Sequence, residues 1–206
     1  SKPRFMLEVE GFILVGGASS RMGTDKALLD LGGQNFVERI HAALASITIG
    51  TTLVGAKGGG AAWPQLRTVP DVHIKWGALG GLHAALAACR AEWAAVVACD
   101  LPFVTGELFV RLASLRENFD AVVPVQQDGR WQPLCALYRT RVCRERTEEL
   151  IASGERRPRA LLNLISTRWV ASHELSDLPG ANLFFTNVNT PEDYANAREK
   201  GEISDK

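Results

Sequence analysis

Short apolar runs alternate with segments of helical periodicity along this chain of 206 residues, and that alternation is the strongest constraint on its fold. The apolar runs lie at 11–15, 49–54, 67–69, 94–98, 121–125, 133–138, 168–171 and 184–186, and the helical patterns at 34–46, 79–90, 106–116, 140–152, 158–165 and 191–200. Strands that are apolar throughout belong to a parallel sheet that helices cover on both faces. We therefore expect a three-layer α/β/α fold with right-handed crossovers, in which the carboxyl ends of the strands share one edge.

One pair of runs departs from the parallel pattern. Asp128 and Gly129 stand between the runs at 121–125 and 133–138, and an Asp-Gly pair favours a tight hairpin. The sheet is thus predicted to be mixed but mostly parallel. The glycine-rich stretch at 57–60 is too short to separate two domains, so residues 1–206 are expected to form a single domain.

The first apolar run leads into a glycine-rich loop. Gly16 and Gly17 follow it, and Arg21 and Lys26 come before the next helical pattern. Glycines allow backbone N–H groups to turn toward an anion, and two neighbouring cations favour a polyphosphate. In α/β folds such a loop is where nucleotides bind. The alternative is a glycine-rich turn with solvated basic side chains.

Two familiar phosphate-binding signatures do not fit this loop. In the Walker A motif a Lys directly follows the last Gly and precedes Ser or Thr, whereas Lys26 stands apart from Gly23 and precedes Ala27. The dinucleotide pattern G-x-G-x-x-G fails because Gly16 and Gly17 are adjacent.

Asp100 follows the apolar run at 94–98, with only Cys99 between them. Its carboxylate is therefore expected at the carboxyl edge of the sheet, level with the glycine-rich loop. There it could bind Mg²⁺, which neutralises charge on a transferred phosphoryl group. Capping of the turn before the next helix is an equally good explanation of its place.

A second group of candidates surrounds the start of the helix predicted at 79–90. Asp71 follows a proline, where an Asp commonly forms a turn. Gly80 and Gly81 open the helix, so their N–H groups could face a base or ribose. Close packing of helix on strand is the competing reason for these glycines.

The charge and the cysteine content limit the classes of binding partner and the cellular compartment that fit this chain. Lys and Arg (23) balance Asp and Glu (23), which argues against nucleic-acid or membrane-surface binding. The longest apolar run is far shorter than a membrane helix, and no export signal opens the chain. The four cysteines form no C-x-x-C pair or zinc spacing, so a reducing cytoplasm is expected.

Five blocks, in order, resemble the molybdenum cofactor guanylyltransferases, enzymes that join GMP to molybdopterin. The blocks are GGASSRMGTDKALL at 16–29, WGALGG at 76–81, ACDLPF at 98–103, QPL at 132–134 and NVNTPED at 187–193. The resemblance implies a Rossmann-like nucleotidyltransferase fold, with a nucleotide-binding N-terminal half and an acceptor-binding C-terminal half.

The resemblance also assigns roles. Lys26, Arg21 and Asp100 are implied to be catalytic, with Asp100 as the metal ligand. The implied nucleotide-binding residues are Leu14, Val15, Gly16, Gly17, Lys26, Asp71, Gly80, Gly81 and Asp100. The implied substrates are GTP and molybdopterin, the cofactor is Mg²⁺, and the candidate protein partners are other cofactor-synthesis proteins and molybdoenzyme chaperones.

The acceptor side is marked by two segments. Arg156 and Arg157 lie in the densest basic cluster of the second half and could bind the acceptor's terminal phosphate, although a solvated helix start explains them equally. By resemblance, Asn187 and Asn189 lie near the pterin. The residues after them already form a helix cap, with Thr190 as the N-cap and a proline at the first helical position.

Other activities stay open at this point. Adjacent glycines at 16 and 17 suggest guanine by resemblance, whereas cytidylyl relatives carry Ala-Gly. Val15, Gly55 and Ala78 stand where the family commonly has Ala, Asn and Pro. The alternatives are a molybdopterin cytidylyltransferase, a sugar-phosphate nucleotidyltransferase and, from a different class, a non-catalytic nucleotide-binding cofactor chaperone.

Overall fold

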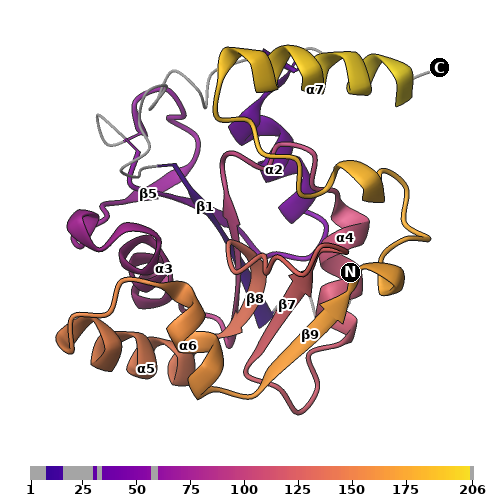
Figure 1. The fold of residues 1–206 in the computed structure, drawn as a ribbon. Coiled ribbons are helices and arrows are strands. Elements are labelled where there is room, and N and C mark those ends of the chain that lie inside the picture. Colours follow the sequence, from indigo (N-terminus) through magenta and orange to yellow (C-terminus); the bar gives the residue numbers. More distant parts are fainter. Residues whose placement is uncertain (1–7, 16–29, 32–33, 57–59, 205–206) are drawn as a thin grey trace.

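In a computed structural model, which describes residues 8–15, 30–31, 34–56 and 60–204, a seven-stranded sheet runs through the centre of the molecule (Figure 1). Its strand order is β5-β4-β1-β6-β8-β7-β9. The strands are β1 (Val9–Leu14), β4 (Thr51–Val54), β5 (Arg67–Val69), β6 (Trp93–Ala98), β7 (Ala121–Val125), β8 (Cys135–Arg139) and β9 (Thr167–Ala171). Two short strands, β2 (Asp30–Leu31) and β3 (Gln34–Asn35), pair with each other outside this sheet.

The sheet is mostly parallel, as the sequence predicts. β8 is antiparallel to both of its neighbours, β6 and β7, and every other pairing in the described part of this sheet is parallel. The predicted Asp128-Gly129 hairpin joins β7 to β8, and Gly129 adopts a φ of +87°, a conformation that favours glycine. The carboxyl ends of all strands except β8 consequently lie along one edge.

Helices cover both faces of the sheet (Figure 1). The helices are α2 (Phe36–Leu44), α3 (Gly77–Ala88), α4 (Gly106–Ser114), α5 (Thr140–Ala152), α6 (Pro158–Leu164) and α7 (Pro191–Ser204). α2 packs with α4, whereas α3, α5 and α6 pack together on the other side. This confirms the predicted three-layer α/β/α arrangement.

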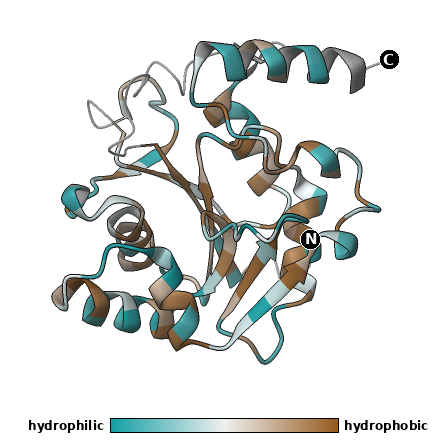
Figure 2. Ribbon diagram, viewed as in Figure 1, coloured by the Kyte–Doolittle hydropathy of each residue, from teal (hydrophilic) through white to brown (hydrophobic). Residues whose placement is uncertain are grey.

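Side chains of each central strand alternate between two cores. In β1, Ile13 belongs to the core beneath α2 and α4, and Phe12 belongs to the core beneath α3, α5 and α6. Figure 2 shows that hydrophobic residues dominate the central strands, whereas the helices around them mix hydrophobic and hydrophilic residues. Burial on both faces explains why these strands are apolar throughout rather than alternating.

The strand predicted at 184–186 is wrong. Gly180, with a φ of +75°, begins a 3-10 turn at Ala181–Leu183, and Thr186 N–H bonds back to Leu183. Phe184 is buried in the core beneath α2 and α4, while Leu183 joins a separate cluster with Phe36. The chain therefore turns here, which places Leu183 and Phe184 in different clusters, and does not extend along the sheet.

The C-terminal helix α7 lies beside α2 (Figure 1). Ala197 of α7 and Phe36 of α2 belong to one buried cluster, together with Phe103, Leu183 and Val188. Of the helices in the described ranges, none combines the length and apolar character that crossing a membrane requires.

Candidate functional site

The carboxyl edge of the sheet brings the end of β1 beside the segment that follows β6. Cys99 N–H donates to Leu14 C=O (3.0 Å), and Val15 N–H donates to Val54 C=O (2.9 Å). Leu14 and Val15 are both buried. Leu14 and Val15, the last described residues before the glycine-rich segment, therefore lie between β4 and the segment that follows β6. Gly16, Gly17, Arg21 and Lys26 themselves lie outside the described residues.

Asp71 and Gly81 meet at this same edge, from segments on either side of a turn. A Cβ atom placed on Gly81 would lie 3.7 Å from Asp71 Oδ2 and 3.4 Å from Leu14 Cδ1. The side chains of Leu14 and Asp71 thus converge on the first turns of α3. Three of the residues that the sequence assigns to the nucleotide are brought together here.

The turn-forming explanation of Asp71 also holds, because its Oδ1 accepts a hydrogen bond from the His73 N–H (3.0 Å). Partial burial raises the pKa of the Asp71 carboxyl above 3.8, and that hydrogen bond offsets part of the rise. The second oxygen, Oδ2, faces Gly81. One carboxylate therefore fixes the turn and presents an acceptor at the sheet edge.

Gly80 is explained by packing. A Cβ atom at this position would lie 2.2 Å from His73 C=O, which is backbone and cannot move aside easily. The absence of a side chain lets the turn before α3 press against the helix. Packing thus accounts for Gly80, whereas Gly81 has room for a methyl group.

Asp100 lies partly buried at the end of β6. Its backbone C=O accepts a hydrogen bond from Val188 N–H (3.0 Å), which places Asn187 and Asn189 beside it. Among the described residues no group of three or more His, Cys, Asp or Glu could hold a metal ion. A single carboxylate at a nucleotide site fits Mg²⁺, which commonly takes one or two carboxylates and completes its shell with phosphates and water.

The basic segment before α6 divides into two environments. Arg157 is paired with Glu155 (3.0 Å), which also accepts bonds from the N–H groups of residues 156 and 157 and has a pKa lowered to about 2. Arg156 instead lies over the Trp76 ring, 4.9 Å from its centroid. Since Trp76 directly precedes α3, Arg156 reaches the segment that the sequence assigns to the nucleotide, while the charge of Arg157 is matched locally.

Two features of the site escaped the sequence analysis. His83 lies 3.4 Å from Glu148 Oε1 through Nε2 and stacks edge-on with His73 (5.0 Å between ring centroids). Trp76 opens the WGALGG block at 76–81, so the sequence marked its position but not its contact with Arg156. The pairing of His83 with Glu148 spans α3 and α5 and has no local signature.

Gly55, where the family commonly has Asn, follows β4 with a φ of +76°. Glycine and asparagine are the residues that most readily adopt this left-handed conformation. The backbone requirement is therefore kept, and only the side-chain amide is missing.

A mostly parallel sheet with a glycine-rich loop after its first strand and an Asp after the adjacent strand is the arrangement of an α/β nucleotide-binding enzyme. Residues 11–173 match the family described as the MobA-like NTP transferase domain. The chain belongs to this family of nucleotidyltransferases.

Individual relatives agree with this assignment over nearly the whole chain. A probable molybdenum cofactor guanylyltransferase of Pelotomaculum thermopropionicum is 34% identical over 97% of this chain and 96% of its own length. One from Bacillus cereus strain Q1 is also 34% identical, over 92% of this chain and 95% of the relative.

Solved structures show the same fold. Molybdopterin-guanine dinucleotide biosynthesis protein A from Archaeoglobus fulgidus matches with a TM-score of 0.76 at 24% identity, over 94% of this chain and 99% of that one. The 2-C-methyl-D-erythritol 4-phosphate cytidylyltransferase of Thermus thermophilus matches with a TM-score of 0.68 at 16% identity, over 93% and 98%.

Proposed function

We propose that this protein transfers GMP from GTP to the phosphate of molybdopterin and releases pyrophosphate. The observation that carries the proposal is the 34% identity, over 97% of the chain, to a probable molybdenum cofactor guanylyltransferase. The convergence of Leu14, Asp71 and Gly81 at the carboxyl edge, beside the segment of Asp100, supports it.

In the proposed reaction an oxygen of the acceptor phosphate attacks the α-phosphorus of GTP. The new P–O bond forms as the bond to the β-phosphate oxygen breaks, and pyrophosphate leaves with that bond's electrons. The acceptor is already an anion, so no protein nucleophile is required. Catalysis then consists of positioning and charge stabilisation.

The chain's own residues would divide this work. Asp100 would hold Mg²⁺, which when bound supplies positive charge to the phosphates. Lys26 and Arg21 would bind the triphosphate and stabilise the pyrophosphate as it leaves, together with N–H groups of Gly16 and Gly17. Asp71 and Gly81 would contact the nucleoside, while Arg156, Arg157, Asn187 and Asn189 would face the acceptor.

Calorimetric titration with GTP, CTP and UTP, each with and without Mg²⁺, tests the nucleotide. Selective binding of GTP that Mg²⁺ strengthens is expected. Preference for CTP would transfer the assignment to a molybdopterin cytidylyltransferase. A pure nucleotide-binding chaperone would bind GTP yet release no pyrophosphate when molybdopterin is added.

Asp100→Asn and Lys26→Ala should each lower the rate of pyrophosphate release about 100-fold or more, because each removes a charge aimed at the transition state. The thermal unfolding midpoint should stay near that of the unaltered protein. Lys75→Ala, which removes an exposed lysine of the turn before α3, is the matched control and should leave the rate unchanged. Activity near wild type in either site variant would remove that residue from the mechanism.

The proposed partners follow from the reaction. The product is a dinucleotide cofactor that a molybdoenzyme or its chaperone must receive, and other cofactor-synthesis proteins must supply molybdopterin. The cytoplasm, where GTP is made and thiols stay reduced, is the expected compartment.

A further inference from the structure

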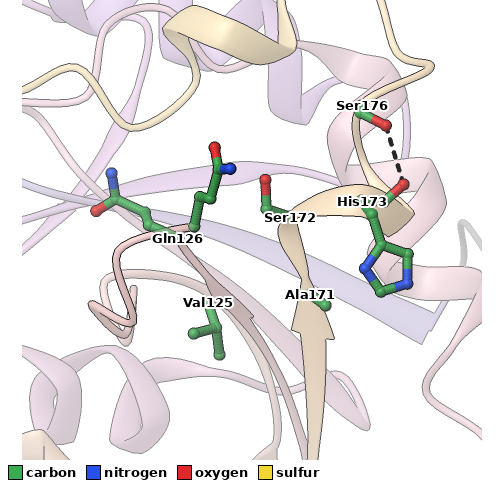
Figure 3. Close-up of a pocket in the computed structure, with 7 residues that line it drawn as sticks. Val125, Gln126, Ala171, Ser172, His173 and Ser176 are labelled. Atoms are coloured by element: carbon green, nitrogen blue, oxygen red, sulfur yellow. Dashed lines mark hydrogen bonds between the residues drawn. The ribbon is translucent and has the colours of Figure 1, made fainter.

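A pocket at the carboxyl ends of β7 and β9 is separate from the residues assigned to the nucleotide (Figure 3). Its volume is about 510 Å³, within the range of small-molecule sites. Val125 and Ala171 are the strand ends beneath it, and its polar lining consists of Gln126, Gln127, Ser172, His173 and Ser176. No Lys, Arg, Asp or Glu lines it in the described part of the chain, so hydrogen bonding and shape would select its ligand.

The pocket is connected to the segment of Asp100 through the β7–β8 hairpin. Ala98 N–H, at the end of β6, donates to Leu134 C=O (2.8 Å). Two residues before Leu134, the Gln132 side-chain amide donates to Gln126 Oε1 at the pocket. An unbroken series of contacts thus runs from the candidate metal ligand's strand to the pocket wall.

The sheet order fixes the pocket's place relative to the two substrates. β8 separates β6 from β7, so at a strand spacing of about 4.8 Å the ends of β7 and β9 stand about 10 and 14 Å from β6. β1 lies on the opposite side of β6. The segment of Asp100, which follows β6, therefore lies between the end of β1 and the pocket along one edge.

The polar groups of the pocket suit a neutral heterocycle. Gln126 Oε1 is engaged by Gln132, and its amide nitrogen has no partner among the described residues. Ser176 Oγ donates a hydrogen bond to His173 C=O (3.0 Å). Figure 3 shows Ser172 Oγ and the Val125 side chain on opposite sides of the strand ends. Amide and hydroxyl groups of this kind pair with the ring nitrogens, amino group and carbonyl of a pterin.

We propose that this pocket receives the pterin rings of the acceptor, with Gln126 and Ser172 as hydrogen-bonding partners of the ring edge. The inference rests on the proposed GMP transfer to molybdopterin. In-line attack requires the acceptor phosphate beside Asp100 and the rest of the acceptor extending away from GTP. The separation between β6 and the pocket accommodates the pyran ring and phosphomethyl arm that join the pterin to its phosphate. Gln132 is a positioning residue, since its contact is with Gln126.

The first test measures acceptor and nucleotide separately. Gln126→Ala and Ser172→Ala should each raise the KM for molybdopterin about three- to tenfold, as loss of one hydrogen bond does. The Kd for GTP from calorimetry and the kcat at saturating acceptor should not change. Gln65→Ala, an exposed glutamine before β5 at the far end of the sheet, is the matched control. An unchanged acceptor KM in the double variant Gln126→Ala, Ser172→Ala would overturn the pocket assignment.

The second test uses binding without turnover. The fluorescence of 6-hydroxymethylpterin should report binding to the unaltered protein and weaker binding to the double variant. Failure of the unaltered protein to bind this pterin, with or without a non-hydrolysable GTP analogue, would overturn the inference. Pterin binding that depends on Gln126 without any GMP transfer would keep the pocket and reject the proposed reaction. GMP transfer with unaltered pterin affinity in the double variant would keep the proposed reaction and reject the pocket as the pterin site.

The role of Gln132 is tested by a double-mutant cycle. Gln132→Ala should raise the acceptor KM in the unaltered background and add nothing once Gln126 is already alanine. An equal effect in both backgrounds would mean that Gln132 acts through the hairpin structure and not through Gln126.

Discussion

At the scale of single residues, the two adjacent glycines of α3 have different reasons for being glycine. Gly80 is required by backbone contact, because an added Cβ would collide with His73 C=O. Gly81 would have only ordinary contacts, with Leu14 Cδ1 and Asp71 Oδ2. Packing of the protein itself therefore accounts for Gly80 and leaves room for a methyl group at Gly81.

Gly80→Ala should lower the free energy of unfolding by about 1–3 kcal/mol, the usual cost of overpacking. Gly81→Ala should raise it by up to about 1 kcal/mol, because alanine is the better helix former. Urea denaturation measures both. In GTP titrations Gly81→Ala should nevertheless weaken binding, since its methyl group faces Asp71 Oδ2. A well-folded Gly81→Ala protein with normal GTP affinity would show that Gly81 does not contact the nucleotide.

At the scale of secondary-structure elements, the sequence predicts nearly all of the sheet and every long helix in the described ranges. Hydrophobic periodicity, the capping hydroxyls of Thr105 and Thr190, and a proline at the first position of α6 carry this information locally. The strand predicted at 184–186 is wrong because a short apolar run resembles a buried strand, while here the chain turns and only Phe184 of the run is fully buried. Local pattern cannot distinguish the two cases, since a turn that inserts one apolar side chain into a core and a buried strand are both apolar.

The site residues likewise divide into those that local sequence places correctly and those whose contacts it cannot predict. Asp71, Gly81 and Asp100 sit at strand or helix ends, where sequence position alone predicts the sheet edge. The contacts of Arg156 with Trp76 and of Gln132 with Gln126 depend on which loops meet across the edge. Such pairings are set by the order of strands in the sheet, which no single segment specifies.

The start of α7 offers a test at this scale. Asp193 Oδ2 accepts bonds from Asn189 N–H (3.0 Å) and Thr190 N–H (3.2 Å), while Thr190 Oγ1 accepts from Asp193 N–H (3.0 Å). Asp193→Ala should cost about 1 kcal/mol in urea denaturation, as loss of a capping interaction does.

Asp193→Asn, which keeps an acceptor oxygen, is its control and should cost less. The same alanine variant should raise the acceptor KM if Asn189 contacts molybdopterin. Equal stability of the two variants would mean that the cap does not hold this segment.

At the scale of the whole molecule, the four cysteines report on both cores at once. Cys99 and Cys135 lie beneath α2 and α4, and Cys89 and Cys143 lie on the opposite face. All four are buried and unpaired by disulfides. Burial raises the pKa of Cys143 to about 12 and that of Cys135 further still, so both thiols stay protonated at neutral pH.

Native protein should accordingly react with Ellman's reagent at pH 8 only as fast as it opens, whereas guanidinium should expose all four thiols at once. Mass spectrometry of the labelled peptides identifies which face opens first. Rapid labelling of any one cysteine in the native protein would contradict its burial.

The reversed direction of β8 has a consequence for how such a scaffold changes over time. The turn between β7 and β8 reaches the carboxyl edge of the sheet and leads into no crossover helix. Arg159 of α6 lies over the Trp131 ring at its base, 4.0 Å from the centroid, whereas the tip at Gly129 has open space beside it, so the tip is the part whose length can vary. Insertions there can change the acceptor-binding surface, while the sequence after β1 is unaltered. New partners for the same nucleotide chemistry can therefore evolve by editing one hairpin, and the same hairpin is the place to graft a different acceptor by design.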